Sequence, residues 1–179
     1  RVRQRMPLMA LTVMGGLVSA KLLALFMDGP ERAVEGQMNT ADILRYLPLI
    51  IGLAGNVGIQ SSTILIRGYA TGEIEEQRQW RAIGGEIATG LTIGLLCGLA
   101  VLLTSSWVES GAAVSNFGTA VGSATALAVA WASLLGCLVP VACARLKLDP
   151  AIVAGPFLIS FSDVTGSLIY IVIARALLF

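Results

Sequence analysis

The sequence predicts an all-α integral membrane protein with five transmembrane helices in a single transmembrane domain covering residues 1–179. Composition is the first observation: 56% of the residues are hydrophobic and 13% are charged, whereas about 25% are charged in an ordinary globular domain. Mean hydropathy is +0.82. The second observation is five apolar stretches of at least about 20 residues, the length that crosses a hydrocarbon core of about 30 Å as a helix.

The five expected spans follow one another with short polar connections. In order, they run approximately over Pro7–Met27, Ile43–Ile66, Ile83–Trp107, Thr119–Cys143 and Ile152–Leu178. The first span is long enough to cross and no small-residue cleavage pattern follows it, so it is not interpreted as a cleavable signal peptide. The chain starts at Arg1 without an initiator Met, and we expect it to be a fragment preceded by a cytoplasmic portion.

Glycine and proline mark three of these spans. Gly90, Gly94 and Gly98 form two overlapping GxxxG steps in the third span, a pattern typical of close helix packing. Pro48 in the second span and Pro156 in the fifth each remove a backbone donor. The carbonyl oxygens freed in this way could bind an ion, although an ordinary kink is the simpler interpretation.

Basic residues collect on one side of the membrane if the spans alternate in direction. Arg1, Arg3, Arg5, Arg67, Arg78, Arg81, Arg145 and Lys147 fall on that side, which leaves Arg32, Arg45 and Arg175 on the other. The positive-inside rule then places the N-terminus in the cytoplasm and the C-terminus outside. We therefore expect a multi-pass protein of the cell (inner) membrane, in contact with the lipid bilayer.

The chain lacks the residues that several functional classes require. Histidine is absent, and Cys97, Cys137 and Cys143 lie in apolar runs without a CxxC pair, so zinc sites, disulfide frameworks and Cys–His nucleophiles have no basis. Twelve basic residues against eleven acidic ones give a net charge of +1, which offers no basic surplus for binding nucleic acid. The chain is not expected to be an enzyme.

Three of the charged residues within the expected spans are candidates for a function in the membrane. A carboxylate at the bilayer centre costs about 2.5–3.5 kcal/mol on insertion scales. Asp163 is near the middle of the fifth span with no basic residue of that span within one turn, so it is the main functional candidate. Lys21 could extend its long side chain to the outer interface, and Glu86 could be solvated at the cytoplasmic interface or pair with Arg81. The roles of Lys21 and Glu86 stay open.

Polar stripes follow the second and fifth spans at helical spacing. In the fifth span the stripe consists of Pro156, Ser160, Asp163, Ser167 and Tyr170, and it is expected to face water, an ion or another subunit. In the second span it consists of Gly52, Asn56, Gln60, Thr63 and Arg67, with Gly55 and Gly58 beside it. Two such faces suggest one hydrophilic pathway, while hydrogen bonding between helices is the alternative for Asn56 and Gln60.

Oxygen ligands without histidine or a suitable cysteine favour a hard cation. Mg²⁺, Ca²⁺ and Mn²⁺ fit this description better than Zn²⁺ or Cu⁺. Because Mg²⁺ keeps several waters and is held by one or two carboxylates, a symmetric dimer that presents Asp163 twice would suit it. Composition alone leaves other divalent ions and a proton relay open.

Two segments resemble the transmembrane domain of the MgtE family of magnesium channels and transporters. The second span reads PLIIGLAGNVGIQSSTILIRGYATGEI from Pro48 to Ile74, similar to the family's GGN helix that leads into an arginine and an ATGE turn. The segment LDPAIVAGPFLISFSDVTGSLIY, from Leu148 to Tyr170, is similar to its DP, GP and DxTG signature. Ala54 replaces the first glycine of the GGN pattern, and Gly155 stands where some relatives have Asn.

The resemblance implies a homodimer with a cation pore on its two-fold axis, lined by the second and fifth helices. Asp163 matches the family's principal magnesium-binding aspartate, and the polar turn of the second helix maps to Gly55 and Asn56. The expected pore-lining positions are Gly55, Asn56, Gly155, Pro156, Ile159 and Ser160. Family members also carry N-terminal cytoplasmic regulatory domains, including CBS modules, which would precede Arg1.

The sequence thus predicts a dimeric channel that conducts Mg²⁺, with Mn²⁺, Co²⁺ or Ca²⁺ as possible substitutes, and with the hydrated ion held by paired Asp163 carboxylates. The closest alternative is a secondary transporter in which Asp163 exchanges a proton for the divalent ion. An intramembrane aspartyl hydrolase would need a second carboxylate at the same site, and Asp149 is expected at an interface. A purely structural membrane subunit is the remaining alternative, for which Asp163 could become Asn without consequence.

Overall fold

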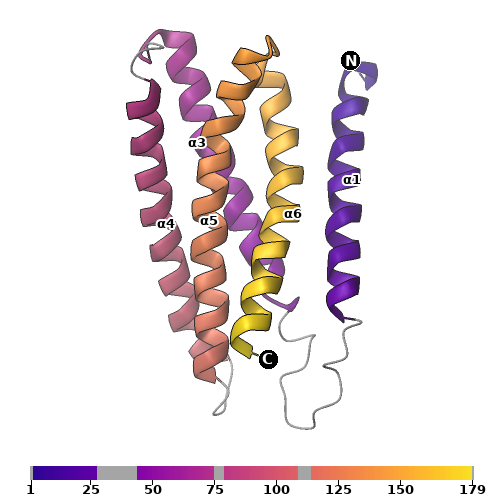
Figure 1. Ribbon diagram of the computed structural model, residues 1–179, viewed down its shortest axis with the longest axis vertical. Coiled ribbons are helices and arrows are strands. Elements are labelled where there is room, and N and C mark those ends of the chain that lie inside the picture. The colour runs from indigo at the N-terminus through magenta and orange to yellow at the C-terminus, as the bar shows by residue number, and fades with distance from the viewer. Residues whose placement is uncertain (1, 28–43, 75–78, 109–113, 179) are drawn as a thin grey trace.

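The computed structural model describes residues 2–27, 44–74, 79–108 and 114–178, and helices account for nearly all of them. These helices are α1 (Val2–Met27), α3 (Leu47–Thr71), α4 (Gln79–Val108), α5 (Val114–Arg145) and α6 (Pro150–Leu178). They run up and down in one bundle, with neighbours along the chain antiparallel (Figure 1). The all-helical prediction is confirmed for the described residues, while Arg1, Arg32 and Arg78 lie outside them.

Four of the helices are long and apolar enough to cross a membrane. The qualifying stretches are Leu47–Thr71, Gln79–Thr104, Phe117–Arg145 and Val153–Leu178. In α1 the apolar stretch among the described residues, Ala10–Leu25, is shorter. Length and composition therefore support four of the five expected spans, and a crossing by α1 stays a prediction.

The second span begins and ends later than the sequence suggests. The expected range is Ile43–Ile66, but α3 covers Leu47–Thr71, and Ile43 itself lies outside the described residues. Pro48 is in the first turn of α3, where a backbone N–H has no partner within the helix, so it frees no carbonyl for an ion. The helix ends where Gly72 adopts a φ of 74° and donates its N–H to the carbonyl oxygen of Tyr69 at 3.3 Å.

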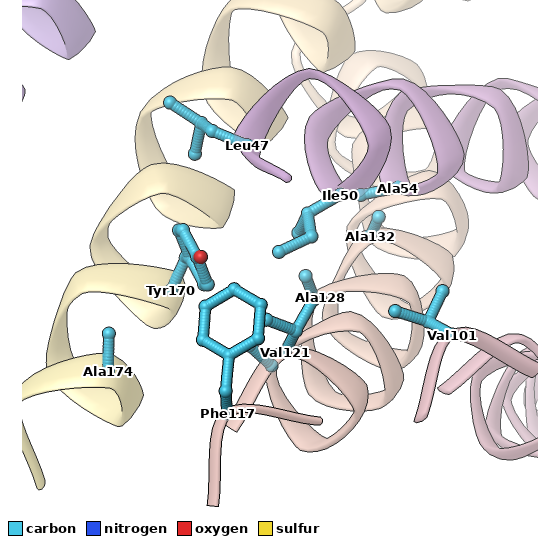
Figure 2. Close-up of a cluster of buried hydrophobic side chains, with 11 residues drawn as sticks. Leu47, Ile50, Ala54, Val101, Phe117, Val121, Ala128, Ala132, Tyr170 and Ala174 are labelled. Carbon is cyan, nitrogen blue, oxygen red and sulfur yellow. The ribbon is translucent and has the colours of Figure 1, made fainter. Parts of the chain in front are cut away.

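α5 is the central helix, because it packs against α3, α4 and α6. α6 in turn lies between α5 and α1 (Figure 1). The main core forms where α3, α5 and α6 meet, with Ile50, Phe117, Val121 and Tyr170 fully buried (Figure 2). This arrangement leaves one long face of α3 and part of α6 outside the core.

The glycines of α4 confirm the close-packing interpretation of the GxxxG steps. A Cβ atom on Gly94 would stand 2.6 Å from the carbonyl oxygen of Ala126, and one on Gly98 would stand 2.5 Å from that of Gly122. Because both obstacles are backbone atoms of α5, any side chain here would push the helices apart.

Candidate functional site

The polar stripe of α3 points away from the core of the bundle. The buried residues of this helix include Ile50, Ala54, Ser61 and Leu65, which share one face. The stripe lies on the opposite face, and all five of its members are exposed: Gly52, Asn56, Gln60, Thr63 and Arg67. A helix long enough to cross a bilayer therefore presents its polar side outward.

The amides of this stripe do not join α3 to its neighbours in the chain. Among the described residues, neither Asn56 nor Gln60 forms a side-chain hydrogen bond. Thr63 donates its hydroxyl to the carbonyl oxygen of Ile59 in its own helix at 2.8 Å. Within one chain, the interpretation of Asn56 and Gln60 as hydrogen-bonding contacts between helices is therefore wrong.

Two glycines on the outer side of α3 have open space beside them. A Cβ atom on Gly52 or Gly55 would meet no neighbouring atom within 4 Å. By contrast, a Cβ atom on Gly58, on the inner side, would stand 3.0 Å from the carbonyl oxygen of Ala132 in α5. Packing inside the chain explains Gly58 but does not explain Gly52 or Gly55.

Asp163 is partly buried on α6 and has no partner for its carboxylate among the described residues. Its backbone carbonyl accepts the hydroxyl of Ser167 at 2.6 Å, a bond within the helix. Gly166 lies beside Ile51 of α3, and the two helices are antiparallel, so Asp163 is nearly level with Ala54. The carboxylate thus lies at the same height as Gly55 and Asn56.

The residues of the polar stripe of α6 lie in different environments. Tyr170 is 0% exposed and belongs to the main core, and Ser167 is also buried. The expectation that the whole stripe faces water, an ion or another subunit is wrong for these two residues, because α6 turns this end of the stripe toward α3 and α5. Asp163 and Pro156 are only partly buried.

The expected pore-lining positions of α6 fall into two groups. Pro156 and Ile159 lie on the same side of the helix as Asp163, at spacings of seven and four residues, and Ile159 is 37% exposed. A Cβ atom on Gly155 would meet no neighbouring atom within 4 Å. Ser160 instead is buried against Gly15 of α1 and donates to the carbonyl oxygen of Pro156 at 2.9 Å.

Within the described part of the chain, no three His, Cys, Asp or Glu side chains are grouped as metal ligands. Lys21 is exposed on α1, and Glu86 is partly buried on α4. The Glu86–Arg81 ion pair that the sequence allowed is not formed between these residues.

Basic residues gather at one end of the bundle. Arg67 is near the end of α3, Arg81 near the start of α4, and Arg145 and Lys147 are at the turn between α5 and α6; all four are exposed. α1 starts at the same end, and the C-terminus lies at the other (Figure 1). The separation of charge expected from the sequence is thus present for these residues.

Sequence reasoning missed a buried polar contact between three helices. The hydroxyls of Ser61 on α3 and Ser133 on α5 lie 3.1 Å apart. Ser133 also donates to the carbonyl oxygen of Glu86 on α4 at 3.2 Å. Small residues at helical spacing beside them, Gly58 and Gly136, were the available signal, since such residues let helices approach closely.

Comparisons with known proteins identify the family of this chain. Residues 47–173 match the model of a family described as MgtE, divalent cation transporter. The chain is 34% identical over 171 residues to the magnesium transporter MgtE of Thermus thermophilus and 30% identical over 173 residues to that of Bacillus subtilis. It is 31% identical over 173 residues to that of Enterococcus faecalis.

These matches include 95–97% of this chain but only 35–36% of each relative, so the chain spans about a third of their length. The matched family region begins with α3 and ends within α6, and it contains both the outward polar face and Asp163. The chain belongs to the MgtE family of divalent cation transporters.

Proposed function

We propose that two copies of this chain form a homodimer that conducts Mg²⁺ along its two-fold axis. The outer face of α3 and the Asp163 side of α6 line the path in each copy. Gly55, Asn56, Gly155, Pro156, Ile159 and Ser160 remain the proposed lining, although Ser160 contacts α1 within the chain. A hydrated Mg²⁺ ion is held between the two Asp163 carboxylates, and Mn²⁺, Co²⁺ or Ca²⁺ are possible substitutes.

The outward polar face of α3 is the observation that carries this proposal. Lipid offers no hydrogen-bonding partner to Asn56 and Gln60, so an exposed polar stripe on a spanning helix needs water or protein beside it. A two-fold interface satisfies this need because the stripe of the second copy faces that of the first across the axis. The stripe then encloses an aqueous path rather than facing hydrocarbon.

Asp163 supplies the selectivity for charge. A single carboxylate in a spanning helix, without a partner among the described residues, is costly unless something compensates its charge. Two such carboxylates facing across a symmetry axis repel each other, and a divalent cation relieves this repulsion more than a monovalent one does. Mg²⁺ also retains several of its waters, which suits a site with few protein ligands.

The orientation follows from the basic end of the bundle. Arg67, Arg81, Arg145 and Lys147 would face the cytoplasm under the positive-inside rule, with the C-terminus outside. The curated relatives are longer, which leaves room for the N-terminal cytoplasmic regulatory domains that we propose precede α1.

Mg²⁺ uptake into liposomes containing the full-length protein tests this function. Asp163→Asn keeps the shape of the side chain but removes its charge, and we expect it to lose uptake while remaining a dimer in size-exclusion chromatography. Asp149→Asn is the matched control, because Asp149 is an exposed carboxylate just before α6 and Asn also caps helices well. Wild-type uptake by Asp163→Asn would refute the proposed role.

The same liposomes distinguish a channel from a coupled transporter. A channel conducts Mg²⁺ down its own gradient whether or not a pH gradient is imposed. In the alternative, Asp163 exchanges a proton for the ion, so collapsing the pH gradient would abolish accumulation of Mg²⁺ against its gradient. Proton movement that accompanies each transported ion in fixed ratio would favour that alternative.

A further inference from the structure

An apolar groove lies between α1 and α6, and Ser160 is the one residue that it shares with the proposed lining of the ion path. Its cavity volume is about 210 Å³, and it is open to the outside of the bundle. Four residues of each helix line it: Leu11, Met14, Gly15 and Val18 on α1, and Phe157, Ser160, Phe161 and Val164 on α6. The Ser160 hydroxyl is bonded to the carbonyl oxygen of Pro156, so the wall is almost entirely hydrocarbon.

The groove results from one close contact with bulky neighbours around it. A Cβ atom on Gly15 would stand 2.8 Å from that of Ser160, so the two backbones are nearest at this point. Phe157 and Phe161 stack on each other, with their ring centroids 5.5 Å apart. The groove lies beside this contact, and among the described residues no side chain fills it.

The position of the groove matches the acyl-chain layer of a membrane. α6 begins at Pro150, at the basic end of the bundle. The apolar stretch of the helix begins at Val153, and Phe157 and Val164 follow four and eleven residues later, about 6 Å and about 16 Å along the helix. One leaflet of a bilayer has a hydrocarbon layer of about 15 Å, so the groove lies at the depth reached by the chains of that leaflet.

The end of the bundle above the groove carries positive charge. Arg145 and Lys147 are exposed in the turn that leads into α6, and exposed basic residues at a membrane surface attract anionic headgroups. A phospholipid in that leaflet would therefore have its phosphate near basic side chains while its chains extend toward Phe157 and Val164. Charge and depth favour the same occupant.

We propose that this groove binds an acyl chain of an anionic phospholipid, such as phosphatidylglycerol, from the leaflet at the basic end. Van der Waals contact drives this binding, since an apolar groove in a bilayer gains no hydrophobic free energy from a lipid tail. The chain would brace α6 at Ser160 and Val164, the neighbouring turns around Asp163. The proposal needs the helices to lie in a bilayer, but it does not depend on which ion crosses.

Photocrosslinking of the full-length protein in liposomes tests the proposal. The probe is phosphatidylglycerol with a diazirine in its acyl chain, and labelled residues are identified by mass spectrometry. We expect labelling of Leu11, Val18, Phe157 and Val164 at least fivefold above that of Leu95 and Leu99, which are exposed apolar residues of α4. The same diazirine in phosphatidylcholine should label the groove less strongly.

Two valines of α1 provide matched variants. Val18→Trp places a large ring in the groove, whereas Val13→Trp adds the same ring at a position that is 62% exposed and outside the groove. We expect only Val18→Trp to reduce labelling of Phe157 and Val164, by at least fivefold, with both variants eluting as the wild type does. Arg145→Gln combined with Lys147→Gln should remove the preference for phosphatidylglycerol.

Three results would overturn the proposal. Equal labelling of the groove and of α4 would mean that lipid contacts both surfaces without preference. Equal labelling by the two lipids would remove the role of the basic residues. Crosslinks from the groove to a second copy of the chain would show that protein, and not lipid, covers it. None of these results bears on whether Asp163 binds Mg²⁺, which the uptake measurements decide.

Discussion

Gly55 and Gly94 should respond in opposite ways to the same substitution. Gly55 has no atom within 4 Å of a Cβ position, so Gly55→Ala needs no rearrangement within the chain. Alanine also favours a helix over glycine by about 1 kcal/mol. At Gly94 the new methyl group would stand 2.6 Å from the backbone oxygen of Ala126, and such overpacking costs about 1–3 kcal/mol.

The expected difference in stability follows from these terms. Gly55→Ala should leave the free energy of unfolding unchanged or raise it by about 1 kcal/mol, whereas Gly94→Ala should lower it by about 0–2 kcal/mol after the same helix gain. Because the helix gain is common to both, the two variants should differ by the overpacking cost of about 1–3 kcal/mol. For a unit of this size, 1 kcal/mol corresponds to about 2–4 °C. The two variants should therefore differ in melting temperature by about 2–12 °C.

Mg²⁺ uptake should be more sensitive to substitution at Gly55 than at Gly94, the reverse of the effect on stability. Gly55→Leu introduces a bulky side chain on the outer face of α3, and if this face lines the ion path, Mg²⁺ uptake should fall at least tenfold in a protein that still folds. Gly94→Ala should reduce the amount of folded protein but not the uptake per folded molecule. Thermal unfolding followed by size-exclusion chromatography, together with liposome uptake, measures both effects. Normal uptake by a folded Gly55→Leu protein would contradict the placement of the path.

Three further outcomes follow from the buried contacts and the site. Tyr170→Phe should keep uptake within about twofold of the wild type, whereas Tyr170→Ala should lower the free energy of unfolding by about 3–5 kcal/mol, because Tyr170 is a core residue; thermal unfolding and uptake together check this. Ser133→Ala should cost about 1–3 kcal/mol by leaving the Ser61 hydroxyl buried without its present partner, and the Ser61→Ala, Ser133→Ala double variant should cost less than the sum of the single changes in a double-mutant cycle. Asp163→Asn should weaken Mg²⁺ binding about 100-fold in calorimetry. Each carboxylate about 5 Å from a hydrated ion contributes about 7 kcal/mol of attraction at an effective dielectric constant of 20. If desolvation leaves a fifth of this attraction, the loss of each carboxylate weakens binding by a factor of about 10, and the dimer loses two.

The helices could be predicted well because their signal is local. Apolar stretches of sufficient length specify spans without knowledge of their neighbours, and four of the five meet that criterion among the described residues. The boundaries of α3 were less certain, because its end depends on the turn at Gly72 and its start on Pro48 within the first turn. Glycine spacing in α4 was also sufficient, since close backbone approach requires small residues at regular positions.

The stripe of α6 shows what the sequence could not provide. Ser160, Asp163 and Tyr170 are equally plausible members of one polar face by spacing alone. Only the packing of α6 against three different helices separates them: Ser160 contacts α1, Tyr170 lies in the core with α3 and α5, and Asp163 is only partly covered. A tyrosine in such a stripe can be polar lining or core, because its ring is apolar and its hydroxyl needs only one partner.

The direction of the α3 stripe was equally beyond the sequence. Spacing placed Asn56 and Gln60 on one face but did not say whether that face met another helix of the chain. The exposure of the stripe and the open space at Gly55 now assign it to the outside of the bundle. This outward direction is what the proposed two-fold interface requires.

Anomalous scattering from Mn²⁺ tests the central claim most directly. Crystals of the full-length protein soaked in Mn²⁺ should show one anomalous peak on a two-fold axis, between the Asp163 carboxylates of two copies and level with Gly55. The peak should be about 4 Å from the nearest carboxylate oxygen of each copy if a water lies between them, and it should be absent in Asp163→Asn crystals. A dimer in which the two Asp163 side chains lie apart, or a Mn²⁺ peak that persists without them, would contradict the account.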